Sequence, residues 1–294
     1  MATTPHPSPD KHGCTMLIAG VQSDVQIGDV AANLGTVREW LGRAADANAS
    51  LVVFPECMLT GYAFDSRQDA LAVALRVNDS WVADLAALAR EADLAVSIGT
   101  LLRGEQDSLH NANLLIDGSG IVGRYDKIHL PHLGVDRFVD RGEIPYQSFR
   151  VGELRVGLAI CYDCSFPEPM RALGLAAADV IALGTNWPVA AARTAEIVPP
   201  ARSMENHLFF VAANRIGHER GFDFCGLSSI CGPDGVELAR AADDQPMMLT
   251  ASIDVAEARN KRIERTAGKH VIDRYADRRP EFYESLIRSD IRPE

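Results

Sequence analysis

The stretch LRVGLAICYDCSFPEPMRALGLAAADVIALGT, residues 154–185, decides the fold. Residues 154–161 and 179–185 are short apolar runs with the length of a buried strand. The residues between them, 167–178, are expected to form a helix. A helix that joins two buried strands is typical of a layered α/β protein.

The same alternation extends toward the N-terminus. Three apolar runs of strand length are residues 15–22, 50–56 and 94–100. Apolar side chains recur every three or four positions in residues 30–41 and 81–92, which predicts two amphipathic helices between these strands. Asp29 is the expected N-cap of the first helix, because its side chain can accept from the free backbone N–H groups of the first turn.

Toward the C-terminus, strands also follow one another directly. Residues 111–117 and 121–127 flank Gly118, Ser119 and Gly120, which predicts a hairpin. Three further strands are expected at residues 207–214, 227–235 and 247–254. Direct strand pairs among helix-connected strands predict mixed sheets in a layered α/β fold, not a purely parallel sheet.

Two C-terminal segments are less regular. Residues 190–206 are expected to be helical, with a bend or an interruption at Pro199 and Pro200, because proline lacks the N–H that a helix needs. From Val255 onward the charged tail is expected to be helical or irregular.

The composition fits a globular chain. Of the 294 residues, 47% are hydrophobic and 23% are charged, which argues against a disordered or fibrous protein. A net charge of −11 disfavours general binding to nucleic acid or to anionic membranes, because an acidic surface repels phosphates. Apolar runs also fall short of the ~20 residues that a membrane span requires.

We expect one folded domain, over residues 14–260. Residues 1–13 read as a flexible tail, without the hydrophobic run of a secretory signal. Residues 261–294 contain too few apolar periods for a core of their own, so this extension is expected to pack on the domain or on a partner subunit. Six cysteines in a chain without a signal are expected to be reduced, which favours a cytoplasmic location.

Three reactive side chains stand directly after apolar strands: Glu56, Lys127 and Cys161. Strand ends at one edge of a sheet converge in space, so these groups are expected to share a pocket. A thiol that attacks a carbonyl, a carboxylate that moves protons and an ammonium that stabilises an oxyanion suffice for acyl transfer. Each group alone has an ordinary alternative: an inert buried cysteine, a helix-start carboxylate and a solvated turn lysine.

The motifs around these residues resemble the three signature blocks of the nitrilase (carbon–nitrogen hydrolase) superfamily. The blocks are FPE at 54–56, DKIHLP at 126–131 and CYDCSFPE at 161–168, and the match continues through 186–188, 201–217 and 226–235. The resemblance covers roughly residues 15–260. It implies an α/β four-layer α-β-β-α sandwich with two mixed sheets, a homodimer or larger homo-oligomer, and no cofactor.

The resemblance also implies roles for the three residues. Cys161 would be the nucleophile, Glu56 the general base and acid, and Lys127 the oxyanion stabiliser, with the backbone N–H of Tyr162 as second donor. A small-molecule amide would become an acid and ammonia through a thioester on the cysteine. Lys127 is expected to favour the thiolate, whereas burial and the ammonium act on the pKa of Glu56 in opposite directions.

The chain departs from the family at a second glutamate. Alignment on Gly142 puts Val135 at that position, and the neighbouring Asp136 could substitute or could belong to a solvated acidic loop. Tyr162 and Asp163 resemble amidases more than nitrilases, which usually carry Trp-Glu there. Residues beside the signature blocks are expected to contact substrate: Tyr62, Tyr162, Asn186 and Trp187, the last of which is equally compatible with core packing.

Other functions remain alternatives. An N-carbamoyl hydrolase or a nitrilase would keep the same three groups. Cys161 and Cys164 form C-x-x-C, the spacing of thiol redox proteins, but that reading gives Glu56 and Lys127 no role. Zinc binding through His129 and His132 lacks further ligands, so no metal is expected. A papain-like site using His207 and Asn214, and an inactive binding protein, are weaker alternatives.

Overall fold

The computed structural model describes residues 15–288. The chain forms two units, and the boundary between them in the sequence lies between Arg259 and Asn260. The tail predicted for residues 1–13 lies outside the described residues. The same holds for residues 289–294 of the predicted C-terminal extension.

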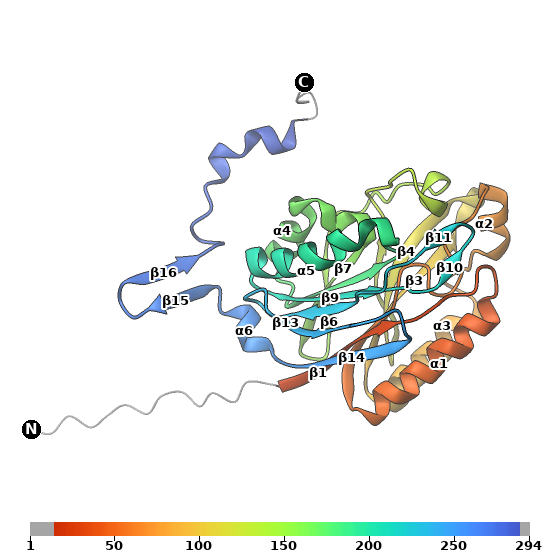
Figure 1. Cartoon of the computed structure of the whole chain (residues 1–294), viewed down its shortest axis with the longest axis horizontal. Helices are drawn as coiled ribbons and strands as arrows, with labels where there is room; N and C mark the ends of the chain where they lie inside the picture. Colours follow the sequence, from red (N-terminus) through yellow and green to blue (C-terminus); the bar gives the residue numbers. More distant parts are fainter. Residues whose placement is uncertain (1–14, 289–294) are drawn as a thin grey trace, which may run out of the picture. The chain divides into compact units, whose positions relative to one another are not determined.

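The first unit contains two six-stranded sheets (Figure 1). The first sheet has the order β14-β1-β2-β3-β4-β5. Its strands are β1 (Thr15–Gln22), β2 (Ala49–Val53), β3 (Ala95–Arg103), β4 (Leu109–Asp117), β5 (Gly120–Asp126) and β14 (Met247–Asp254). Strands β1, β2 and β3 are parallel, and the other three pairings are antiparallel.

The second sheet has the order β13-β12-β9-β8-β7-β6. Its strands are β6 (Ser148–Val151), β7 (Leu154–Ile160), β8 (Val180–Thr185), β9 (Phe209–Asn214), β12 (Ser229–Cys231) and β13 (Glu237–Arg240). Strands β7, β8 and β9 are parallel, and the remaining pairs are antiparallel. Both sheets are therefore mixed, as the direct strand pairs predict.

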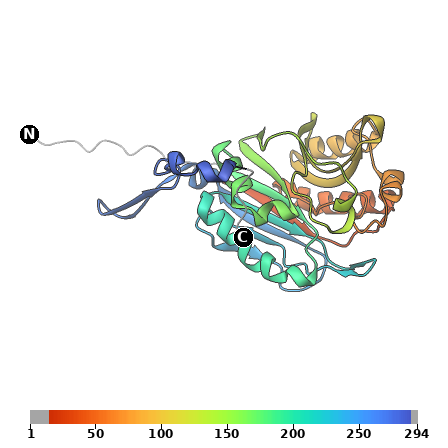
Figure 2. The same cartoon turned by 90° about the horizontal axis from the view of Figure 1, so that it is seen from above.

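Helices cover the outer face of each sheet (Figure 2). Helices α1 (Val30–Asp46) and α3 (Ser80–Ala92) pack on the first sheet, and α4 (Pro167–Leu175) and α5 (Ala192–Asn206) pack on the second. Side chains alternate across the first sheet: Ile18 and Leu51 join the core between the sheets, whereas Ala19 and Val52 join the core beneath α1 and α3. This arrangement is the expected four-layer α-β-β-α sandwich.

Local chemistry explains two helix features. Asp29 caps α1 as predicted, since its side chain accepts from the N–H of Ala32 at 3.0 Å. Helix α5 continues through Pro199 and Pro200, so of the expected bend or interruption, the interruption does not occur. The carbonyl of Ala195, whose helical donor would be residue 199, instead accepts from the guanidinium of Arg240 at 3.5 Å.

Several shorter elements have no clear sequence signal and were not predicted. These are α2 (Arg67–Val73), the edge strands β6 and β13, and the two-residue strands β10 (His218–Glu219) and β11 (Phe222–Asp223). After β14, helix α6 (Val255–Arg259) ends the first unit and agrees with the expected helical tail.

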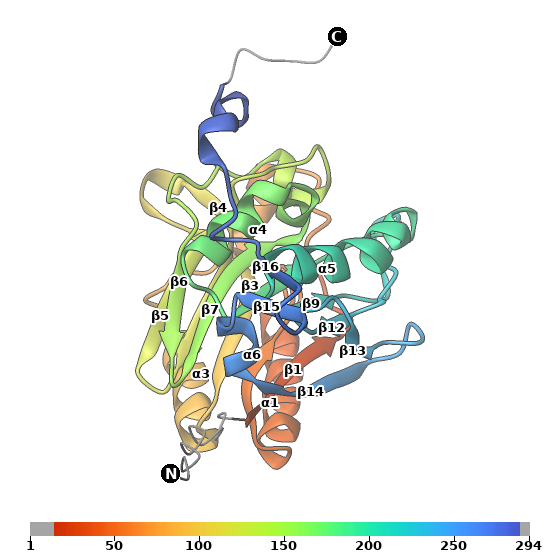
Figure 3. The same cartoon turned by 90° about the vertical axis from the view of Figure 1, so that its left-hand side faces the viewer.

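The second unit differs from the expected helical or irregular tail. Strands β15 (Arg262–Thr266) and β16 (His270–Asp273) form an antiparallel hairpin, followed by short 3-10 turns (Figure 3). Gly268 has a φ of +65° in the connecting turn, a conformation that glycine adopts without strain. Among residues 15–288, no helix is both long and apolar enough to cross a membrane, and all five cysteines are free.

Candidate active site

Three side chains at strand ends form a buried cluster. Glu56 lies three residues beyond β2, Lys127 directly follows β5, and Cys161 directly follows β7. All three are nearly inaccessible, with exposed fractions of 1%, 1% and 6%. Lys127 Nζ donates to Glu56 Oε1 at 2.7 Å, and the charges of both residues shift the pKa of the Cys161 thiol. The structure therefore brings together the three groups that the strand ends predict.

Cys161 occupies a strained turn. It begins the 3-10 turn Cys161–Ser165, and its φ of +41° lies in the left-handed region. A residue with a side chain held in this region costs about 1–3 kcal/mol, and such residues concentrate at functional sites. The thiol thus lies at the sharp bend between a strand and a turn.

Glu56 has one oxygen committed to the protein and one that is not. Oε1 accepts from Lys127 Nζ and from Asn111 Nδ2, both at 2.7 Å. Oε2 is buried and has no hydrogen-bond partner. Burial raises the pKa of Glu56, and the charge of Asp136 adds to this, although Lys127 acts in the opposite direction. A carboxylate with a free buried oxygen and a raised pKa is suited to proton transfer.

Lys127 lies between two carboxylates. Its Nζ also donates to Asp136 Oδ2 at 2.6 Å, so Asp136 is inside the cluster and not in a solvated loop. Asp136 accepts in addition from Tyr62 Oη at 2.8 Å and from Asn111 Nδ2 at 2.9 Å. Burial by itself lowers the pKa of Lys127, but the charges of Asp136 and Glu56 outweigh it and raise this pKa well above its usual value. The ammonium ion is therefore permanently charged near neutral pH.

Burial has the largest effect on the pKa of the Cys161 thiol. Burial raises the pKa of Cys161 well above 9.0, the charge of Glu56 raises it further, and Lys127 and the backbone amide of Asn186 lower it in part. Lys127 thus has the effect predicted from the sequence, but it does not prevail over burial. A thiol with a raised pKa can attack only if a base removes its proton as it does so. Glu56 is the charged residue with the largest effect on the pKa of this thiol.

The four predicted substrate contacts differ in placement. Tyr62 reaches Asp136, and Asn186 Nδ2 donates to the backbone carbonyl of Glu56 at 3.0 Å. Asn186 Oδ1 is buried without a partner. Trp187 is buried, and its backbone N–H donates to Asn214 Oδ1 at 2.8 Å. Tyr162 is 38% exposed, lies in the turn that carries the thiol, and packs its ring edge-on against Phe166.

The histidines and the cysteine on which the papain-like, zinc and C-x-x-C alternatives depend lie in other surroundings. His207 Nδ1 bonds to the carbonyl of Pro233 at 3.0 Å, and His129 Nδ1 bonds to Asp163 at 2.8 Å. His132 is exposed, and Cys164 is a fully buried free thiol. Within residues 15–288 no group of three or more His, Cys, Asp and Glu side chains is arranged to hold a metal ion.

Two residues around the cluster, Asn111 and Glu219, were not predicted from the sequence. Asn111 joins Glu56 to Asp136, and the only signal for it is an asparagine within an apolar strand, where burial demands hydrogen-bond partners. Glu219 Oε1 accepts from the backbone N–H groups of Tyr62 and Ala63 at 2.8 and 2.5 Å and so fixes the loop that carries Tyr62. No sequence pattern indicated this contact.

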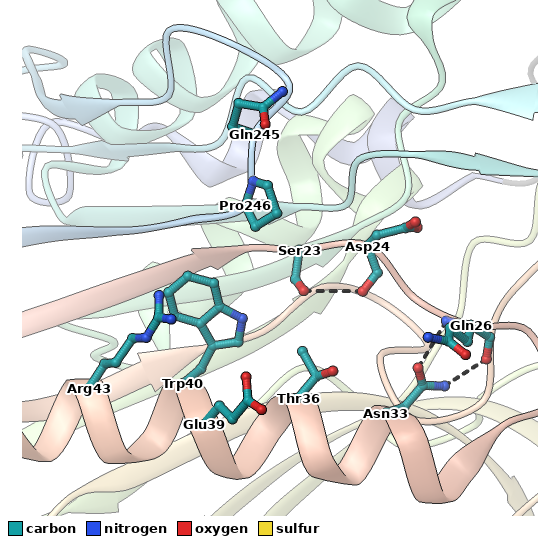
Figure 4. A pocket seen from close by; sticks show the side chains of 10 residues that line it. All are labelled: Ser23, Asp24, Gln26, Asn33, Thr36, Glu39, Trp40, Arg43, Gln245 and Pro246. Atoms are coloured by element: carbon teal, nitrogen blue, oxygen red, sulfur yellow. Dashed lines mark hydrogen bonds between the residues drawn. The ribbon is translucent and has the colours of Figure 1, made fainter.

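A separate surface cavity of about 470 Å³ lies beside α1 (Figure 4). It is lined by Ser23, Asp24, Gln26, Asn33, Thr36, Glu39, Trp40, Arg43, Gln245 and Pro246. The side chain of Asn33 accepts from and donates to the backbone of Gln26, and Arg43 stacks over Trp40 at 4.5 Å. None of its lining residues belongs to the buried cluster, and we assign it no chemistry.

Comparisons with known proteins support this picture. A family model described as carbon-nitrogen hydrolase matches residues 17–263. A nitrilase of Pyrococcus abyssi (strain GE5 / Orsay) is 33% identical over 267 residues, which cover 90% of this chain and 98% of that protein. An (R)-stereoselective amidase of Pseudomonas sp is 31% identical over 233 residues, which cover 78% of this chain and 82% of that protein.

A solved structure shares the fold. The amidase from Nesterenkonia sp. AN1, as a double mutant in complex with acrylamide, has a TM-score of 0.80 to this chain. The likeness covers 95% of this chain and 100% of that one, at 24% identity.

Proposed function

This chain belongs to the carbon-nitrogen hydrolase family, and from that premise we propose that it hydrolyses a small primary amide to a carboxylic acid and ammonia. The resemblance of its motifs to the nitrilase (carbon–nitrogen hydrolase) superfamily is confirmed. The observation that carries the proposal is the contact between Lys127 Nζ and Glu56 Oε1, both buried, beside a thiol on a strained turn.

Acylation uses all three groups. Glu56 takes the thiol proton as Cys161 Sγ attacks the carbonyl carbon, which forms a tetrahedral adduct with a negatively charged oxygen. Lys127 Nζ and the backbone N–H of Tyr162 stabilise that oxygen. Glu56 then passes its proton to the amide nitrogen, the carbon–nitrogen bond breaks, and ammonia leaves a thioester on the cysteine.

Deacylation reverses the proton path. Glu56 removes a proton from water while the water oxygen attacks the thioester carbon. The carbon–sulfur bond then breaks, the acid departs, and the sulfur recovers its proton from Glu56. One carboxyl group thus serves as base and acid in turn, and its raised pKa suits both tasks because proton transfer is best near the working pH.

Asp136 is proposed as the auxiliary carboxylate in this chain. It holds Lys127 Nζ at 2.6 Å, opposite Glu56, and keeps the ammonium charged in a buried place. Tyr62 and Asn111 fix its two oxygens in turn. Asp136 therefore acts on the oxyanion through Lys127, and Tyr62 acts through Asp136.

Two unpartnered acceptors favour an amide over a nitrile. Glu56 Oε2 and Asn186 Oδ1 are buried and lack donors. The orientation of the Asn186 amide is fixed, because its Nδ2 already donates to a backbone carbonyl. A primary amide brings two N–H donors on the nitrogen that must leave, whereas a nitrile brings none. Buried acceptors left unpaired are costly, so the nitrile would bind and react poorly.

Ammonia release from propionamide is expected to exceed that from propionitrile by about 10⁴-fold in kcat/KM, the discrimination typical of sites built to bind an N–H group. The screen includes an N-carbamoyl amine, which carries the same terminal NH₂ and therefore tests the carbamoyl alternative. Equal rates on amide and nitrile, or turnover of the nitrile alone, would contradict the assignment. A C161A sample supplies the background.

The pH dependence of kcat/KM is expected to follow the raised pKa values of Glu56, Cys161 and Lys127. Because the pKa of Glu56 lies above 4.5, its base form appears only at higher pH, and the acid limb should titrate above 4.5. The pKa values of Cys161 and Lys127 lie above 9.0 and 10.5, so activity should not decline below pH 9. An acid limb at or below 4.5, with circular dichroism unchanged, would refute this description of Glu56.

Three expectations remain predictions. We propose that the protein acts in the cytoplasm and as a homodimer or larger homo-oligomer. We also propose that residues 14–260 form the catalytic domain, with residues 261–294 as an extension.

A further inference from the structure

Asp163 is a buried carboxylate that the mechanism above does not use. It lies two residues after Cys161 and is fully inaccessible. Oδ2 accepts from the backbone N–H of Ile160 at 2.9 Å and from Tyr125 Oη at 2.8 Å. Oδ1 bonds to His129 Nδ1 at 2.8 Å and accepts from Tyr146 Oη at 3.0 Å. The two carboxylate oxygens of Asp163 thus form hydrogen bonds with four polar groups.

These partners come from two catalytic segments. Ile160 immediately precedes Cys161. Tyr125 lies two residues before Lys127, and its hydroxyl also accepts from the backbone N–H of Ile128, one residue after it, at 3.1 Å. Asp163 therefore connects the chain on both sides of the catalytic lysine to the residue that leads into the nucleophile.

The strained turn explains why such a connection is needed. The φ of +41° at Cys161 is unfavourable by about 1–3 kcal/mol, so the surrounding structure must hold it. The bond from Ile160 N–H to Asp163 Oδ2 closes the turn directly around Cys161. The Lys127 backbone has further support, since its N–H donates to the Asn111 carbonyl at 2.9 Å. Loss of Asp163 should thus displace the thiol more than the ammonium.

We propose that Asp163 is a positioning residue for catalysis, which holds Cys161 Sγ in line with Glu56 and Lys127 by closing the turn and joining it to the Tyr125–His129 segment. The proposal rests on the proposed function for its turnover readout. Its second readout, the alkylation rate of the Cys161 thiol by 2-chloroacetamide, requires no knowledge of the substrate.

Asparagine should substitute in part for Asp163. Its oxygen can still accept from Ile160 N–H and from Tyr125 Oη. Its NH₂ group would face His129 and Tyr146, and these can both become acceptors, because a histidine can change tautomer and a hydroxyl can rotate. Alanine offers neither function and leaves the Ile160 N–H buried without an acceptor.

The chain supplies a matched control at the other end of the same strand. Asp179 is also buried, and its Oδ2 accepts from the backbone N–H of Arg155 at 2.9 Å, near the start of β7. Asp163 binds the last N–H of that strand. D179A therefore removes a buried carboxylate that, like Asp163, accepts a backbone N–H of β7, but at the end of the strand away from the thiol.

The experiment measures kcat, KM, thermal unfolding and Cys161 alkylation for D163A, D163N and D179A. For D163A, kcat and the alkylation rate are expected to fall about 100-fold, the effect of a small misplacement of a reacting group, with KM within about threefold. D163N should recover at least about tenfold of that loss. D179A should lower the unfolding temperature while leaving kcat and alkylation unchanged.

Three results would overturn the proposal: equal losses of kcat in D163A and D179A, a loss confined to KM, or wild-type alkylation in folded D163A. Should D163A fail to fold, Y125F tests the second part of the proposal, the connection to the Tyr125–His129 segment, because it removes the hydroxyl that bonds to Asp163 and accepts from Ile128 N–H. In that variant, kcat unchanged would count against the proposal. If no amide is turned over by the wild type, the proposed function fails, but the alkylation rates still decide the role of Asp163.

Discussion

The C161A variant is expected to lose amide hydrolysis by a factor of about 10⁴ or more while keeping its fold. Removal of a nucleophile that forms a covalent intermediate has effects of this size, because the residual rate comes only from binding and oxyanion stabilisation. The side chain is 6% exposed and sits on a strained turn, so its replacement by alanine removes one sulfur and little packing. Ammonia release measures the loss of hydrolysis, and circular dichroism checks that the fold is kept.

Cys164 provides the control for that variant. It is a buried free thiol on the same 3-10 turn, three residues after Cys161. Under reducing conditions C164S should retain most of the activity, because no step of the proposed mechanism uses this sulfur. Full activity in C161A would end the account, and equal loss in both variants would favour the C-x-x-C redox reading.

Lys127→Met is expected to have the second largest effect, on rate and on stability together. Loss of one oxyanion donor costs about 10²–10³-fold in kcat. In the wild type, Lys127 Nζ lies 2.7 Å from Glu56 Oε1 and 2.6 Å from Asp136 Oδ2. In the variant, both carboxylates would be left buried without their counter-charge. Removal of one partner from a buried ion pair destabilises a fold by about 3–5 kcal/mol.

The stability loss should depend on pH with a defined sign. Without the ammonium, the pKa of Glu56 rises further, since the lowering effect of Lys127 is gone. A carboxyl group whose folded pKa is raised binds its proton more tightly in the native state, so it stabilises at low pH and loses that contribution as pH rises. Lys127 itself, with a folded pKa above 10.5, stabilises the wild type at all pH values below 10.5.

Urea unfolding of wild type and variant at about pH 5 and about pH 8 tests this sign. The deficit of Lys127→Met should be larger at pH 8. A deficit that is independent of pH, or larger at pH 5, would show that the three charges do not interact as the structure indicates. Lys269→Met removes an exposed lysine and should change neither activity nor stability.

Strands could be predicted from the sequence where they are buried, because a buried strand is a continuous run of apolar residues. The first strand was placed at residues 15–22, its observed bounds, because apolar residues fill it. The edge strands β6 and β13 were missed because SFRV and ELAR carry polar and charged residues that edge positions tolerate. The hairpin of β15 and β16 was missed for the same reason, since nearly all its side chains are exposed or half-buried.

In the site, too, some residues could be predicted from the sequence and others could not. Glu56, Lys127 and Cys161 could be found because each follows an apolar strand, and strand ends converge. Asp136 stayed ambiguous because its place depends on a short 3-10 turn, Gly134–Arg137, that turns its side chain inward. Gly134 lies so close to the Tyr62 ring that a side chain there would collide with it. Contacts of this kind join distant segments and leave no local signal.

Two connections between segments far apart in the sequence have no sequence pattern that predicts them. Glu219 supports Tyr62 from 157 residues away, and Asp163 reaches Tyr125 across 38. Both are acidic residues, Glu219 in the two-residue strand β10 and Asp163 in a 3-10 turn, and sequence alone favours a solvated side chain for such residues. Their burial follows from which strands lie next to one another, and that is a property of the assembled sheets.

The central claim is that Cys161 reacts within a site that binds a primary amide. The most direct test is limiting alkylation of the wild type by 2-chloroacetamide, with the labelled cysteines identified by peptide mass spectrometry. Exposure alone favours Cys225, which is half-buried, over Cys161. We predict instead that Cys161 is labelled first and that a substrate amide protects it. Preferential labelling of Cys225, or labelling of Cys161 that no amide slows, would contradict the account.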